Sequence, residues 1–129
     1  MERIFDKRTM YLVSVFQTTT SLFPKDCIEN NNTVYFILPK DGKVSPEQKI
    51  ALSKILGKKI SFIKYYDNLE DFLRYMISPK VKVEKLDNNT VMLRLNKFNY
   101  LKYKKHKEVL DTIISRLYGI DKILVKTII

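Results

Sequence analysis

The stretch from Lys97 to Lys107 carries the residue types best suited to bind a polyanion. It contains five lysines and three aromatic residues but no acid. Lysine side chains contact phosphate groups, and aromatic rings stack on unpaired bases at about 1–3 kcal/mol per base. In the alternative interpretation, Phe98, Leu101 and Tyr103 pack inside the protein and the lysines are merely solvated. The residues that we expect to contact nucleic acid here are Lys97, Tyr100, Lys102, Tyr103, Lys104, Lys105, His106 and Lys107.

Catalytic and metal chemistry finds little support in the other residues. The chain has one histidine, His106, and one cysteine, Cys27. These two side chains cannot by themselves build a Cys/His metal site or a nucleophile–base pair. Cys27 falls in an expected strand, where it is a small buried apolar residue. We therefore expect no enzyme activity, no metal or other cofactor and no small-molecule substrate.

The net charge indicates the class of partner. The 129 residues include 24 Lys and Arg against 14 Asp and Glu, which gives a formal net charge of +10. A basic excess of this size favours nucleic acid or an acidic protein surface as the partner. The alternative is that the lysines only keep the protein in solution.

The composition also predicts a cytoplasmic protein without a membrane segment. No apolar run reaches the roughly 18–20 residues that a membrane-spanning helix needs. The N-terminal sequence MERIFDKRT is too charged for a signal peptide. A single cysteine excludes an internal disulfide framework, which suits a reducing compartment.

A repeated sequence organises the chain. The residues Asn-Asn-Thr-Val occur at 31–34 and again at 88–91. Each copy starts a strand-like run, which is followed by a polar segment, a helical pattern that stops at Gly57 or Gly119, and another strand-like run. The shared order predicts two α+β units in tandem, each a small sheet covered by helices. We expect the first unit to span residues 1–79 and the second 80–129.

Apolar spacing and turn residues predict the individual elements. Ser45 and Gln48 form a capping box around Pro46, and Asp67 with Glu70 suggests a second one. The buried stripe of the helix after Ser45 is expected to comprise Ala51, Leu52, Ile55 and Leu56. The expected elements of the first unit are helix 8–22, strand 25–29, turn 30–32, strand 34–38, loop 39–44, helix 46–56, strand 60–65 and helix 69–77. Those of the second unit are strand 81–86, turn 87–89, strand 91–95, loop 97–107, helix 109–117 and strand 120–128.

This order of elements resembles the archaeal NusA-like transcription factors, which contain two prokaryotic-type (type II) KH units. The resemblance covers about residues 8–126 and is best in the first unit. It rests on the helix that runs into Lys25-Asp26-Cys27-Ile28, the strand Thr33 to Leu38, the helix end Leu56-Gly57-Lys58-Lys59, and the helix start from Tyr66 to Phe72, which Pro79 closes.

The resemblance implies a Gly-x-x-Gly loop at a helix N-terminus, where free N–H groups and the helix dipole favour an RNA phosphate. By position this loop falls on residues 43–46 and 103–106, and neither copy has the glycines. In the first copy Ser45 occupies a helix donor, Pro46 removes one and Glu47 adds a negative charge. We therefore expect this loop not to bind RNA in the usual manner, although Lys40 and Lys43 remain candidate contacts.

The resemblance implies an RNA-associated factor in transcription elongation, termination or antitermination, which binds single-stranded RNA, RNA polymerase or both without catalysis. A competing interpretation is a degenerate KH module that docks on polymerase or ribosome through its lysines. A ribosome-associated assembly factor that binds structured RNA is consistent with the same charge.

Overall fold

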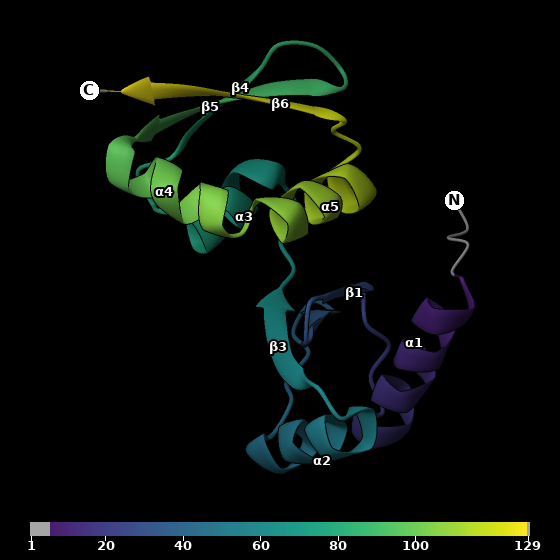
Figure 1. The fold of residues 1–129 in the computed structure, drawn as a ribbon. Coiled ribbons are helices and arrows are strands. Elements are labelled where there is room, and N and C mark those ends of the chain that lie inside the picture. Colours follow the sequence, from purple (N-terminus) through teal and green to yellow (C-terminus); the bar gives the residue numbers. More distant parts are fainter. Residues whose placement is uncertain (1–5, 129) are drawn as a thin grey trace. The chain divides into compact units, whose positions relative to one another are not determined.

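The computed structural model describes residues 6–128 of the chain as an α+β protein (Figure 1). The elements in chain order are α1 (Lys7–Thr20), β1 (Asp26–Asn30), β2 (Thr33–Leu38), α2 (Pro46–Leu56), β3 (Lys59–Lys64), α3 (Leu69–Met76), β4 (Lys82–Lys85), β5 (Thr90–Asn96), α4 (Lys97–Lys105), α5 (Lys107–Tyr118) and β6 (Lys122–Ile128). The α+β class predicted from the sequence is confirmed.

The chain folds as two compact units, Met1–Tyr65 and Tyr66–Ile129. The boundary was expected after residue 79, so the structure moves α3 from the first unit to the second. The contacts of Tyr118 in α5 give the reason. Its ring lies 5.4 Å from the ring of Phe72 in α3, and its hydroxyl donates a 2.6 Å hydrogen bond to the Tyr66 carbonyl. Helix α3 therefore packs against α5 and belongs to the second unit.

The two sheets have the same topology, as the repeat predicts. Each has three strands, in the orders β1-β2-β3 and β4-β5-β6. In each sheet the first two strands form an antiparallel hairpin, and the third lies parallel to the second. A parallel neighbour needs a crossover connection, which α2 provides in the first unit and α4 with α5 in the second.

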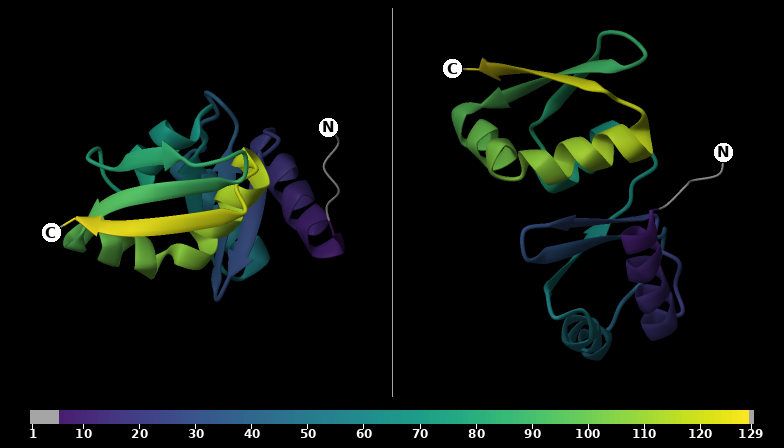
Figure 2. Two further views of the ribbon diagram at one scale, coloured as in Figure 1. Left: turned by 90° about the horizontal axis from the view of Figure 1, so that it is seen from above. Right: turned by 45° about the vertical axis from the view of Figure 1, so that its right-hand side comes forward.

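The core of the first unit lies between its sheet and the helices α1 and α2 (Figure 2). The rings of Phe16 and Phe36 approach to 4.6 Å between centroids, and Phe62 lies 6.4 Å from both. Cys27 is buried in the same cluster, as expected. Of the predicted α2 stripe, Leu52 is buried, Ala51 and Leu56 are partly buried, and Ile55 is wrong because it is 54% exposed.

Local signals at the ends of the helices are largely confirmed. Ser45 and Gln48 form the predicted capping box, and Gly57 and Gly119 adopt left-handed conformations with φ of 64° and 69°. Helix α3 is the exception, because Asn68 caps it in place of Asp67 and accepts a hydrogen bond from the Asp71 amide. Both side chains could cap, and the backbone turns into the helix one residue later than the sequence suggested.

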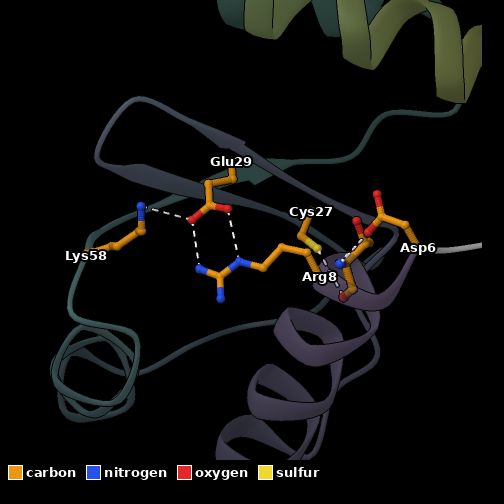
Figure 3. A network of polar contacts seen from close by, with 6 residues as sticks. Asp6, Arg8, Cys27, Glu29 and Lys58 are labelled. Atoms are coloured by element: carbon orange, nitrogen blue, oxygen red, sulfur yellow. Dashed lines mark hydrogen bonds and ion pairs between the residues drawn. The ribbon is translucent and has the colours of Figure 1, made fainter.

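One ion-pair network ties the first unit together (Figure 3). Glu29 in β1 accepts hydrogen bonds from Nε and Nη2 of the Arg8 guanidinium, at 3.0 and 2.8 Å. Lys58, which follows the end of α2, lies 3.0 Å from the same carboxylate. The hydrogen bonds from Arg8, followed by those from Lys58, lower the pKa of Glu29 to about 2. The network therefore joins α1, β1 and the turn after α2.

Candidate nucleic-acid interface

The lysine-rich stretch 97–107 is helical, which corrects the expected loop. Helix α4 begins directly after β5, and the side chain of Asn96 caps it by accepting a 2.8 Å hydrogen bond from the Asn99 amide. Only His106 separates α4 from α5. Because lysines and aromatics give α4 no regular apolar spacing, its sequence lacks the usual signal of a helix. The Asn at the end of the preceding strand was the available clue.

Tyr103 is not available to stack on a base, which corrects its expected role. Its side chain is 2% exposed, and its hydroxyl donates a 2.7 Å hydrogen bond to Asp111 Oδ1 in α5. Burial and this hydrogen bond both raise the pKa of the phenol. Tyr103 therefore joins α4 to α5 and lies inside the unit.

Lys107 is also used within the protein. Its ammonium group donates a 2.7 Å hydrogen bond to Asp111 Oδ2, four residues along α5. This contact with the Asp111 carboxylate raises the pKa of Lys107. The side chain remains 59% exposed, but its charge is compensated. Lys107 is therefore a weaker candidate for a phosphate contact than the other lysines of the stretch.

The surface of α4 that faces solvent combines apolar and basic side chains. Phe98 is 77% exposed and Leu101 is 54% exposed. Lys102 and Lys105 follow at spacings of four and seven residues from Phe98, which places all four side chains on one helix face. We call these four residues the α4 outer face. The alternative interpretation, in which Phe98 and Leu101 pack inside the protein, is wrong for both residues.

The remaining candidates of the stretch border this face. Lys97 and Lys104 are exposed and lie to one side of it, and Tyr100 is half-buried. His106 is exposed in the turn, and no side chain caps the N-terminus of α5. Free N–H groups at a helix N-terminus attract anions. Glu108 in the first turn of α5 weakens this attraction for anions, because it places a negative charge beside the N–H groups.

The two candidate residues of the first unit lie in a loop and not on a helix. Lys40 and Lys43 are exposed in the loop before α2. The loop starts with a tight turn, in which the Gly42 amide donates a 2.9 Å hydrogen bond to the Pro39 carbonyl and Asp41 has a φ of 63°. At the N-terminus of α2, Ser45 Oγ accepts a 3.1 Å hydrogen bond from the Gln48 amide, and Pro46 has no N–H to offer. This agrees with the expectation that Ser45 occupies one donor of the helix start and Pro46 removes another.

Residues 6–128 contain neither a cluster of metal ligands nor a membrane-spanning helix. No group of three or more His, Cys, Asp or Glu side chains lies close enough together there to hold a metal ion. In the same residues, every helix is too short or too polar to cross a membrane.

Comparison with known proteins gives one informative likeness. No protein-family model matches the chain, and no curated protein matches its sequence. The solved structure described as "Crystal structure of APE1850" superposes with a TM-score of 0.70 at 19% sequence identity. The match covers 95% of this chain and 100% of that one. At this identity the likeness concerns the fold alone, and it extends over both units.

Proposed function

We propose that the protein is a NusA-like, RNA-associated factor of transcription elongation, termination or antitermination. In this proposal it binds single-stranded RNA, RNA polymerase or both, and it acts without catalysis. Its two units are interpreted as type II KH-like units whose signature loops have lost their glycines.

The order of elements supports the KH-like interpretation. Each unit starts with a helix, continues with an antiparallel hairpin and ends with a strand parallel to the second strand of that hairpin. The helix N-terminus that would meet RNA in such a unit is that of α2 in the first unit and α5 in the second. The two differ in chemistry, because Ser45 caps α2 whereas α5 has no side-chain cap.

The α4 outer face is the observation that carries the proposal. It places the 77% exposed ring of Phe98 beside Lys102 and Lys105, with Lys97 and Lys104 at its edge. Phe98 and Leu101, which is 54% exposed, lie together on this face, and exposed apolar patches rimmed by polar residues mark interaction sites. The same combination is favourable on single-stranded RNA, since a base stacks on the ring while the lysines contact the phosphates.

A second candidate function is docking on a protein partner through the first unit. An apolar cleft of about 290 Å³ lies between α1 and α2, lined by Tyr11, Ser14, Val15, Thr18, Thr19 and Ile55. Two of the lining residues are large exposed side chains, Tyr11 at 47% and Ile55 at 54%. An amphipathic helix of polymerase or another protein could bury these side chains.

A titration of fluorescent single-stranded and duplex RNA at two salt concentrations tests the proposal. We expect tighter binding to the single strand, with log affinity falling by about 0.7 per log salt for each phosphate contact. Binding that is absent, or equal for a single strand and a duplex, would contradict the RNA-binding part of the proposal and favour the docking function.

A further inference from the structure

The second sheet has one face that no helix of its own unit covers. Helices α3, α4 and α5 all lie on the other side of β4, β5 and β6 in both views (Figures 1 and 2). Along β5, Val91, Leu93 and Leu95 are buried, whereas the alternating residues Met92 and Arg94 are partly exposed. Because side chains alternate between the faces of a strand, Met92 and Arg94 mark the open face.

Three cations stand opposite one another across this open face. Lys82 in β4 is paired with Arg94 in β5, and Arg94 is paired with Lys126 in β6. We call these three residues the cation row. Adjacent strands lie about 4.8 Å apart, so the three backbone positions span about 10 Å. Like charges directly opposite each other destabilise a sheet, and here two such pairs share Arg94.

Within the cation row, an acidic side chain neutralises only the charge of the middle residue, Arg94. Glu84 lies 3.3 Å from the Arg94 guanidinium, in a pair that is about half exposed to solvent. Within residues 6–128, neither Lys82 nor Lys126 forms an ion pair, and both are exposed. Lys122, nearer the start of β6, adds a further exposed cation to the same face. An anion bound along the row would neutralise the repulsion between its like charges, which the protein's own acidic side chains do not fully offset.

Apolar side chains next to the row indicate which kind of anion fits. Met92 is paired with Leu124, and both are partly exposed one position away from Arg94 and Lys126 along their strands' open face. A strip of apolar surface beside a line of cations matches a nucleic-acid strand, whose bases and phosphates run side by side. A regularly spaced line of cations also suits repeating phosphates better than the scattered carboxylates of a folded protein.

We propose that the open face of the β4-β5-β6 sheet is a second RNA-binding surface, on which the cation row contacts the phosphates of a single strand. The inference rests on the proposed function, because it assumes that RNA is a ligand. It adds a surface on the opposite side of the sheet from α4, so the two surfaces contribute separately to binding.

The experiment compares three variants of the full chain in titrations of a single-stranded RNA over a range of salt. Lys82→Gln with Lys126→Gln removes the two uncompensated cations and leaves the pair of Arg94 with Glu84 intact. The matched control, Lys49→Gln with Lys54→Gln, removes two exposed lysines from α2. The third variant replaces Lys102, Lys104 and Lys105 on α4 by Gln.

We expect the row variant to weaken binding and to lower the slope of log affinity against log salt by about 1.4, at 0.7 per lost contact. The α2 control should leave the slope unchanged. At low salt and without RNA, the row variant should melt at a higher temperature than the natural chain, because the repulsion is gone. If the double variant does not fold, Lys126→Gln alone should lower the slope by about 0.7.

The outcomes separate this inference from the proposed function. A folded row variant with unchanged affinity and slope overturns the inference, whereas a loss in the α4 variant at the same time still supports RNA binding through α4. A loss in the row variant alone supports the inference and removes α4 from the site. If polyglutamate binds as tightly as RNA and is equally sensitive to the row variant, the assignment to RNA is wrong. If the natural chain shows no salt-dependent binding to RNA, both proposals are overturned.

Discussion

The hydroxyl of Tyr103 donates a 2.7 Å hydrogen bond to Asp111 Oδ1 and thereby joins α4 to α5 across the turn at His106. Lys107 binds the other oxygen of the same carboxylate, also at 2.7 Å. A residue that looked suited to base stacking thus has a structural role. The hydrogen bond holds the Tyr103 side of α4 against α5, while Phe98, five residues earlier, is exposed to solvent.

Replacement of Tyr103 by Phe should lower the stability of the protein without changing how salt affects RNA binding. The variant leaves Asp111 without one of its donors, and a buried hydrogen bond to a charged group contributes about 1–3 kcal/mol. Urea denaturation measures the change in the free energy of unfolding. Tyr100→Phe is the matched control, since Tyr100 is half-buried, and it should have little effect. A stable Tyr103→Phe variant that binds RNA more weakly would contradict this expectation and show that Tyr103 contacts RNA.

Replacement of Phe98 by Ala should weaken binding to single-stranded RNA while the salt slope stays the same. Stacking of one base contributes about 1–3 kcal/mol, and loss of a stacked base releases few ions. Because the ring is 77% exposed, the melting temperature should change little. Phe23→Ala, at a phenylalanine that is 56% exposed in the first unit, is the control for a nonspecific loss of aromatic surface. Equal losses in both variants would contradict a specific role for Phe98.

Replacement of Lys102, Lys104 and Lys105 together by Gln should flatten the salt dependence of RNA binding. Each lysine that touches phosphate contributes about 0.7 to the slope, so three contacts contribute about 2. The control removes Lys49, Lys54 and Lys59, which are exposed in the first unit. A folded α4 variant with unchanged affinity and slope would move the site away from α4.

Restoring glycines to the first loop should raise its affinity for RNA. The changes Lys43→Gly and Pro46→Gly return a backbone donor and let a phosphate approach the start of α2. Gel-shift titration of single-stranded RNA measures the gain, and circular dichroism shows whether α2 remains helical. The expectation that this loop is inert fails if Lys43→Ala with Glu47→Ala abolishes RNA binding in the natural background.

Glu29 should make the stability of the protein depend on pH in the acidic range. Its pKa is lowered to about 2 by Arg8 and Lys58 in the folded state. The carboxylate therefore stabilises the fold above its ordinary pKa of about 4.3, and this contribution is lost as the pH falls from that value towards 2. Glu29→Gln should cost about 1 kcal/mol near neutral pH, because the network is partly exposed to solvent.

Thermal denaturation of the natural chain and Glu29→Gln between pH 2 and 7 tests this expectation. The two proteins should converge at the acidic end. A cycle that adds Arg8→Gln isolates the interaction between the two side chains. A difference in stability that stays constant over the whole pH range would show that Glu29 acts through packing and not through its charge.

The class of fold and the repeat of the two sheets could be predicted from the sequence. The paired Asn-Asn-Thr-Val segments, the capping box at Ser45 and the glycines Gly57 and Gly119 are local signals that act through backbone conformation. They predicted the hairpin of each unit and most of the helix ends to within a residue or two.

The candidate site depended on the tertiary structure to a much greater degree. The lysines and aromatics of residues 97–107 identified the region, but their sequence gave no sign of which ring is buried. Tyr103 is the buried ring because Asp111, eight residues further along the chain, accepts the hydrogen bond that a buried phenol needs. The domain boundary likewise followed from the contact of Tyr118 with Phe72, 46 residues away. The cation row is a property of strand register, because Lys82, Arg94 and Lys126 become neighbours only when three strands align. Local sequence thus determined the elements, and pairing between distant residues decided which side chains meet a partner.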